Sequence, residues 1–234
     1  MARELAGGGR AVEVGPERLS GWFDRFAQRH GGIDSTRIGR DRVEVRATDG
    51  SVAAVPVGFG GLPEPHGERP GLAVSGLVEH VRRPRRIGLV LVRLGAHSVG
   101  IARGGKVQQS STDRPRVQGR TKAGGWSQQR YARRRQKQAR HSLDDAADAV
   151  ARVLVPERAN LDAVVLGGDR AALEQLRRRA GERSHRALAD LLDTAEPRVL
   201  DVPEPRRAVL DRAALRATAV EVEIHDTGDG GPAS

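Results

Sequence analysis

The sequence contains no cysteine among its 234 residues. Disulfide bridges, thiol nucleophiles and thiolate metal ligands are therefore excluded. Aromatic residues make up only 3% of the chain, so the core has to be built from Val, Leu, Ile and Ala. No apolar run is long enough to span a bilayer, and residues 1–10 lack an apolar stretch of signal-peptide length. We therefore expect a cytoplasmic protein with no membrane partner.

The charge of the chain is strongly unbalanced. It carries 40 Lys and Arg against 30 Asp and Glu, which gives a net charge of +10. This balance favours a polyanionic partner, because each phosphate that a cation neutralises releases condensed counterions. The abundance of Ala, Arg and Gly also fits a GC-rich genome, and surface charge also serves solubility. The positions of the cations along the chain therefore indicate a partner better than the net charge does.

Residues 1–82 are predicted to form a small α+β region. Leu19, Trp22, Phe23 and Phe26 recur at helical spacing after Pro16, which predicts an amphipathic helix over residues 16–30. The other expected features are a flexible start at 7–9, a strand at 42–46, a hairpin turn at 49–50, a strand at 51–57, a Gly- and Pro-rich loop at 58–71 and a short helix at 72–81. The basic run at 82–86 marks a boundary.

Residues 83–225 show the alternation of a larger domain. Strands are expected at 87–94, 98–102, 106–109, 161–166, 198–202 and 220–224, the last at a sheet edge, and helices at 129–154, 170–180, 184–194 and 205–217. A long exposed loop is expected over about 110–130, and a disordered tail over 226–234. We therefore predict an α/β fold with a mixed sheet.

The segment from Gly119 to Arg140 contains no Asp or Glu. An arginine-rich composition would not remove acidic residues from one stretch, and a cationic helix repels itself unless an anion lies beside it. If residues 130–140 are helical, positions 130, 133, 134 and 137 share one face. We predict phosphate contacts from the cations and base stacking from the aromatic residues. The predicted RNA-binding residues are Arg120, Lys122, Trp126, Arg130, Tyr131, Arg133, Arg134, Arg135, Lys137 and Arg140.

Gly124 and Gly125 lie in the middle of the expected loop. Adjacent glycines allow backbone conformations that other residues avoid, and they let the backbone approach a ligand closely. Gln128 and Gln129 follow, and their amides offer donors and acceptors that do not titrate. This combination suits the positioning of a water molecule and the stabilisation of an oxyanion, rather than acid–base catalysis.

Together these residues resemble the GGQ loop and following helix of archaeal and eukaryotic class I release factors, where Gly-Gly-Gln precedes an Arg-Phe-Ala-Arg helix start. In this sequence Arg130, Tyr131, Ala132 and Arg133 stand in that place. The likeness is closer still to the actinobacterial branch of the Vms-like release factors, in which the tip glutamine is displaced. It extends over about residues 87–202.

The resemblance implies a ribonuclease-H-like catalytic domain that hydrolyses peptidyl-tRNA on stalled large ribosomal subunits. Trp126 follows the two glycines where a strict motif has Gln, so Gln128 becomes the first candidate for the catalytic amide and Gln129 the second, with Gly124 and Gly125 forming the turn. The implied partners are large-subunit ribosomal RNA and peptidyl-tRNA. We expect a monomer that uses no cofactor and no metal.

Other clusters in the sequence have simpler explanations. None of the seven histidines forms a metal-spaced pair. Asp144, Asp145 and Asp148 lie one helical turn apart, where ion pairs with arginines explain them. Gly167, Gly168 and Asp169 follow an expected strand but lack the Lys-Ser/Thr of a phosphate loop, so Asp169 is interpreted as a helix N-cap.

Two alternative functions remain open at the level of sequence. A tRNA endonuclease would need clustered acids with a metal, or a His or Lys base, and the acid-free segment argues against the metal-dependent form. A factor that binds the ribosome or RNA without chemistry is favoured by Trp126 at the Gln position. The length of the released RNA distinguishes the first alternative, and ribosome binding without turnover distinguishes the second.

Overall fold

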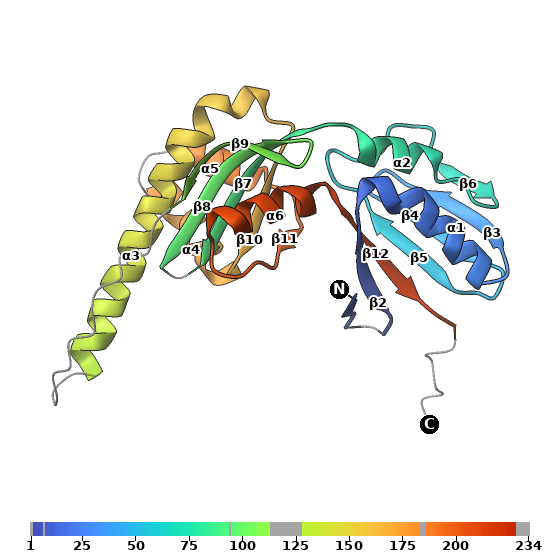
Figure 1. Cartoon of the computed structure of the whole chain (residues 1–234), viewed down its shortest axis with the longest axis horizontal. Coiled ribbons are helices and arrows are strands. Elements are labelled where there is room, and N and C mark those ends of the chain that lie inside the picture. The colour runs from blue at the N-terminus through green and yellow to red at the C-terminus, as the bar shows by residue number, and fades with distance from the viewer. Residues whose placement is uncertain (1, 7, 94, 113–127, 183–185, 228–234) are drawn as a thin grey trace. The chain divides into compact units, whose positions relative to one another are not determined.

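The computed structural model divides the chain into two compact units, Met1–Pro84 together with Thr218–Ser234, and Arg85–Ala217 (Figure 1). It describes residues 2–6, 8–93, 95–112, 128–182 and 186–227, and for residues 128–140 it describes the backbone alone. The split between Pro84 and Arg85 lies within the basic run at 82–86 that the sequence marks as a boundary.

The first unit contains a seven-stranded antiparallel sheet in the order β1-β2-β12-β5-β4-β3-β6. The bounds of its strands are Ala2–Glu4 for β1, Arg10–Val14 for β2, Ile33–Ile38 for β3, Arg42–Ala47 for β4, Val52–Pro56 for β5, Gly67–Pro70 for β6 and Val220–His225 for β12. The hairpin predicted at 49–50 joins β4 to β5, and its strands pair as expected.

Two helices cover one face of this sheet (Figure 1). Pro16–Arg18 form a 3-10 turn that leads into α1 (Leu19–Arg29), and α2 runs over Ser75–Arg82. Leu19, Phe23 and Phe26 are buried in a cluster with Leu77 and strand residues such as Val45. The helical spacing of these apolar residues therefore predicted the buried face of α1 correctly.

Strand β12 lies in a different sheet from the one expected. The sequence pattern suggested that residues 220–224 form an edge of the larger domain, but β12 lies inside the first sheet, between β2 and β5. The alternation of Val220, Val222 and Ile224 indicates one buried face, yet it does not say which sheet provides the partner strands. The chain is also anchored beyond this strand, because Asp226 forms an ion pair with Arg10 at 2.9 Å. Residues 228–234 of the expected tail lie outside the described residues.

The second unit contains a five-stranded mixed sheet in the order β11-β10-β7-β8-β9. Strands β7 (Arg86–Arg93), β8 (Ala96–Arg103) and β9 (Lys106–Thr112) form an antiparallel meander. Strands β10 (Ala163–Gly168) and β11 (Val199–Leu200) continue the sheet in parallel on the other side of β7. A three-stranded antiparallel meander extended by parallel strands, with helices between them, confirms the predicted mixed α/β class.

Helices lie on both faces of this second sheet. The bounds are Gln128–Val153 for α3, Val155–Asn160 for the 3-10 helix η2, Arg170–Glu182 for α4, Arg186–Asp193 for α5 and Arg207–Thr218 for α6. Val99 and Ile101 share one buried cluster with α3, α4 and α5. The opposite face meets α6, because a Cβ at Gly100 would lie 2.9 Å from Leu210. None of the described helices is long and apolar enough to cross a membrane.

The turn between β10 and α4 depends on Gly168. Its φ is +108°, and a Cβ there would lie 2.1 Å from the carbonyl oxygen of Val92. The next residue fulfils the predicted capping role, since Asp169 accepts the N–H of Ala171 at 2.9 Å through its carboxylate. The close approach and the cap together fix the direction in which α4 leaves the sheet.

Candidate functional site

Helix α3 carries the described part of the predicted site. It spans 26 residues from Gln128 to Val153, which at 1.5 Å per residue gives a length of about 39 Å. Figure 1 shows its N-terminal half extending past the sheet of its own unit, while the C-terminal half lies against that sheet. The predicted start at about 129 and end near 154 are confirmed within a residue, and Val155–Asn160 follow as a 3-10 helix with Pro156 in its first turn.

The C-terminal half of α3 is anchored by apolar packing. Leu143, Ala146, Ala147, Val150 and Val153 are all buried in the core of the second unit. They follow the i, i+3, i+4, i+7 pattern that the sequence predicts. Burial of a Leu or Val side chain contributes about 1.5–3 kcal/mol relative to exposure. This packing holds one half of a long helix firmly and leaves the other half to project.

An ion pair reinforces α3 one turn beyond the end of the cationic segment. Arg179 of α4 pairs with Asp144 of α3, and the two side chains are 23% and 21% exposed. Asp145 and Asp148 are exposed. The sequence interpretation of these three aspartates as partners of arginines is therefore confirmed for Asp144. The pair ties α3 to α4 at the point where the projecting half begins.

The end of β9, from which the chain leaves the sheet, is held by hydroxyl groups. Ser98 of β8 and Thr112 lie 2.7 Å apart through their hydroxyl oxygens. Arg152 donates from Nη2 to Ser111 Oγ at 2.8 Å, and Arg207 donates from Nη1 to Ser110 Oγ at 3.0 Å. Three consecutive residues are thus fixed from β8, α3 and α6. No sequence pattern indicates these hydrogen bonds, because Ser111 and Arg152 are 41 positions apart.

The predicted site residues fall into two groups. Arg120, Lys122, Gly124, Gly125 and Trp126 lie outside the described residues. The others lie on the backbone of α3, and they are Gln128, Gln129, Arg130, Tyr131, Arg133, Arg134, Arg135, Lys137 and Arg140. Of the loop expected over about 110–130, residues up to Thr112 belong to β9 and residues from Gln128 belong to α3, and the residues between them lie outside the described ranges. Both candidate glutamines therefore stand in the first turn of a helix.

The continuous helix confirms the condition for the predicted cationic stripe. Positions 130, 133, 134 and 137 recur at helical spacing along one element. Counted at 100° per residue from the buried positions 143, 147 and 150, positions 130, 134 and 137 fall on the opposite side of α3, and position 133 falls on its flank.

The described residues offer no cluster of three or more His, Cys, Asp or Glu that could hold a metal ion. Histidines in the first unit have structural surroundings instead. His30, which is 9% exposed, has its Nδ1 at 2.8 Å from Asp49 and its ring 4.4 Å from that of Phe26. His80 has its Nε2 at 3.1 Å from the carbonyl oxygen of Gly58.

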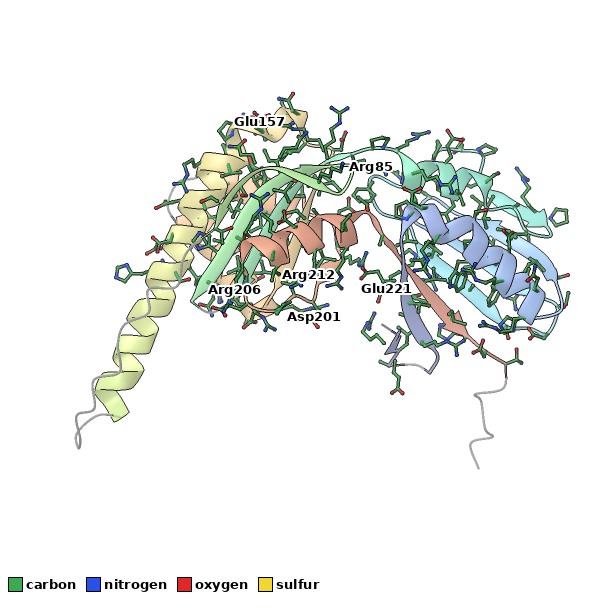
Figure 2. The ribbon with its side chains drawn as sticks, in the orientation of Figure 1. Arg85, Glu157, Asp201, Arg206, Arg212 and Glu221 are labelled. Carbon is green, nitrogen blue, oxygen red and sulfur yellow. The ribbon has the colours of Figure 1, made fainter. Side chains whose placement is uncertain are left out.

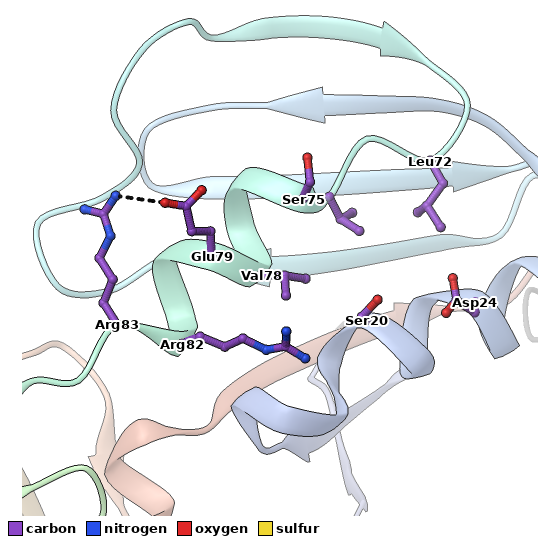
Figure 3. Close-up of a pocket in the computed structure, with 9 residues that line it drawn as sticks. Ser20, Asp24, Leu72, Ser75, Val78, Glu79, Arg82 and Arg83 are labelled. Atoms are coloured by element: carbon purple, nitrogen blue, oxygen red, sulfur yellow. Dashed lines mark ion pairs between the residues drawn. The ribbon is translucent and has the colours of Figure 1, made fainter.

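A shallow pocket of the first unit lies between α1 and α2 (Figure 3). Its volume is about 640 Å³, and Leu72, Val74 and Val78 supply its apolar surface. Charged and hydroxyl groups surround this surface, including the Glu79–Arg83 ion pair at 3.7 Å. Neither the composition nor a motif indicates this pocket in the sequence, because its lining comes from two amphipathic helices and the turn before α2.

The second unit matches a known protein family. Residues 85–223 match the family model described as the Actinobacteria/chloroflexi VLRF1 release factor. The match covers more than half of the chain and includes the whole of the second unit, Arg85–Ala217. A comparison with curated proteins gives no match.

Solved structures give distant matches. The chain is 12% identical to an archaeal translation termination factor, aRF1, with a TM-score of 0.36, over 88% of this chain and 66% of that one. Pelota from Archaeoglobus fulgidus is 14% identical with a TM-score of 0.32, over 93% and 66%. A structure described as an archaeal protein is 15% identical with a TM-score of 0.36, over 72% and 48%. The chain spans about half to two thirds of the length of these structures.

Proposed function

We propose that this chain, which belongs to the Actinobacteria/chloroflexi VLRF1 release factor family, is a peptidyl-tRNA hydrolase that acts on large ribosomal subunits. Membership of a release factor family places the chain in translation and links it to the ribosome. The ester hydrolysis, the large-subunit RNA and the peptidyl-tRNA substrate are our proposal. We likewise propose that the protein acts as a monomer in the cytoplasm.

The observation that carries the proposal is the placement of the acid-free segment on α3. The segment 119–140 contributes eight cations and no carboxylate, and its helical part is the half of α3 that projects from the sheet. A cationic helix with one anchored end can enter a cavity lined by phosphates without moving the rest of its unit. The peptidyl-transferase centre of a large subunit is a cavity of that kind.

The chemistry that we propose for the site needs no titrating side chain. Gln128 is the first candidate to hold a water molecule against the ester carbonyl of peptidyl-tRNA, and Gln129 is the second. An amide or a backbone N–H would stabilise the developing oxyanion. Gly124 and Gly125 would allow the backbone to come close to the terminal adenosine. The arginine positions of α3 would contact ribosomal RNA phosphates.

The decisive experiment is a release assay on isolated large subunits that carry peptidyl-tRNA. We expect the wild-type protein to free the nascent chain and to leave the tRNA full length. Gln128→Ala should lower the rate by roughly 10²-fold or more if its amide acts on the transition state. Gln175→Ala is the matched control, because Gln175 is exposed on α4. Unchanged release by the variants at both Gln128 and Gln129 would refute the assigned roles.

The same assay separates the proposal from its alternatives. A shortened tRNA would indicate an endonuclease. Binding to the subunit without release would indicate a factor that occupies the ribosome without chemistry, which Trp126 at the Gln position favours. A Trp126→Gln variant would then be informative, because it restores Gln directly after the two glycines.

A further inference from the structure

The last residues of β9 have little apolar packing to hold them. Ser110, Ser111 and Thr112 are all half-buried, and β9 is the edge strand of the described sheet, where β8 is its neighbour. An edge strand that ends in small polar residues is expected to fray. In this unit a set of side-chain hydrogen bonds replaces the missing packing. We call these contacts the β9 clamp, and its members are Ser98, Ser110, Ser111, Thr112, Arg152 and Arg207.

The β9 clamp contacts the strand from both of its faces. Successive side chains of a strand point to opposite faces, so Ser110 and Ser111 face different helices. Ser110 accepts a hydrogen bond from Arg207 of α6, and Ser111 accepts one from Arg152 of α3. Ser98, whose side chain is fully buried, bonds to Thr112 from the paired position on β8. Charge-assisted bonds of this length are stronger than neutral ones.

Arg207 is itself held in place for this contact. Its Nε donates to Asp211 one turn later on α6, at 3.1 Å. The guanidinium therefore bridges a carboxylate of its own helix and the hydroxyl of Ser110, and this bridge fixes the side chain in one orientation. Arg152 lies on the anchored half of α3, where neighbouring Val150 and Val153 are buried. Both arginines thus extend from elements that the core already immobilises.

We infer that Arg152 and Arg207 are positioning residues, which fix the end of β9, the last described element before Gly124 and Gly125 in the sequence. This inference rests on the proposed function. The Arg152–Ser111 bond joins the element from which the chain departs, β9, to the element to which it returns, α3. A displacement of about 1 Å at a reacting group can lower a rate by roughly 10²-fold. Releasing the end of β9 should therefore reduce the rate of ester hydrolysis without weakening the contacts that α3 makes with RNA.

The test uses variants that remove the acceptors and keep every charge. Ser110→Ala with Ser111→Ala deletes both hydroxyl groups, whereas Ser110→Thr with Ser111→Thr keeps them. Because none of these changes alters the net charge, RNA affinity through counterion release should stay the same. Ser75→Ala, on the exposed start of α2, is the matched control. Release is measured on large subunits carrying peptidyl-tRNA, as a function of protein concentration.

We expect the double alanine variant to show a saturating rate constant roughly tenfold below wild type, with the half-saturating concentration unchanged within about twofold. The threonine pair should keep the wild-type rate. Hydrogen exchange of the 110–112 amides in the free protein should accelerate in the alanine variant alone. The inference is overturned if the saturating rate is unchanged, if only the half-saturating concentration rises, or if the melting temperature of the whole protein falls with the rate.

Failure of the proposed function and failure of the positioning role give different results. If the wild-type protein releases no peptide, the proposed function fails, and the exchange measurement alone decides whether the clamp holds β9. If the wild type releases peptide and the alanine variant does so equally fast, the proposed function stands and the positioning role is rejected. Equal exchange rates in the alanine and threonine variants would also reject the clamp, whatever the release assay shows.

Discussion

Arg179 and Asp144 form an ion pair between α4 and α3 in which each side chain is about four-fifths buried. The pair lies where the anchored half of α3 ends and the projecting half begins. A carboxylate that is largely removed from water depends on its cation, because breaking a buried pair leaves an uncompensated charge. The attachment of α3 to α4 at this point therefore depends in part on this one ion pair.

Replacement of Arg179 should destabilise the second unit. We expect Arg179→Ala to lower the free energy of unfolding by about 1–2 kcal/mol, less than for a fully buried pair because one fifth of each group is exposed. Urea denaturation measures the change. Arg178→Ala, which removes an exposed arginine from the same helix, should change stability by less than about 0.5 kcal/mol. Strict additivity of Asp144→Asn and Arg179→Ala would contradict the proposed coupling.

Substitution of two glycines, one just before α4 and one near its end, should change the stability of the protein in opposite directions. Gly168→Ala forces a Cβ to within 2.1 Å of the Val92 carbonyl oxygen at a φ of +108°, and should cost roughly 3 kcal/mol or more. Gly181→Ala places a Cβ in open space within α4, and should raise stability by up to about 1 kcal/mol. Thermal unfolding of the two variants tests both. If the two substitutions changed stability equally, the β10–α4 turn would have to rearrange to accommodate the new Cβ.

The contribution of Asp49 to the stability of the first unit should be present at neutral pH and should be lost in acid. The carboxylate accepts the Ser51 N–H and lies 2.8 Å from His30 Nδ1, and these contacts lower its pKa below the usual 3.8. A lowered pKa in the folded state adds stability above the unfolded pKa, and this stability disappears as the pH falls through the folded value.

We therefore expect Asp49→Asn to be less stable than wild type at neutral pH, with a difference that shrinks below about pH 4. Denaturation midpoints at a series of pH values give this difference. Asp34→Asn serves as control, since Asp34 is an exposed carboxylate on β3 of the same sheet. A stability difference between wild type and Asp49→Asn that stays constant with pH would show that the charge of Asp49 is not what stabilises the fold.

The cations on the projecting half of α3 should determine the salt dependence of ribosome binding. Removing one cation that binds a phosphate should reduce the slope of log K against log salt by about 0.7–0.9. We expect this reduction for Arg133→Ala, Arg134→Ala and Lys137→Ala individually. Arg212→Ala removes the same charge from the exposed side of α6 (Figure 2), and it should leave the slope unchanged. Equal slopes for all four variants would mean that binding responds to net charge alone.

Periodicity predicted much of the second unit. Helix α3 was predicted within a residue at each end because its buried face repeats at 3.6 residues and Pro156 follows. Strand β7 was predicted because an unbroken apolar run from Ile87 to Val92 suits a central strand with both faces covered. The sequence places a boundary at 82/83 because a basic run with proline seldom belongs to a core, and the two compact units divide two residues later, after Pro84.

The elements that were not predicted carry weak or ambiguous signals. Strand β6 (Gly67–Pro70) has every residue exposed, so no apolar pattern marks it, and its pairing with β3 depends on backbone hydrogen bonds. Strand β3 places polar residues between Ile33 and Ile38. For the site, the sequence locates the cations of α3, but the contacts of Ser111 and Ser110 need the tertiary fold. Nothing local in a sequence indicates that Arg152 and Arg207 will meet one strand from opposite faces.

The position of β12 between β2 and β5 makes the second unit an insertion within the first. During synthesis from the N-terminus, residues 85–217 emerge before Val220, so the inserted unit has its complete sequence first. Strands β2 and β5 cannot be joined through their shared neighbour until that later strand is available. The surrounding sheet can therefore close only once β12 has been added, and it closes across an insertion whose own sequence is already complete.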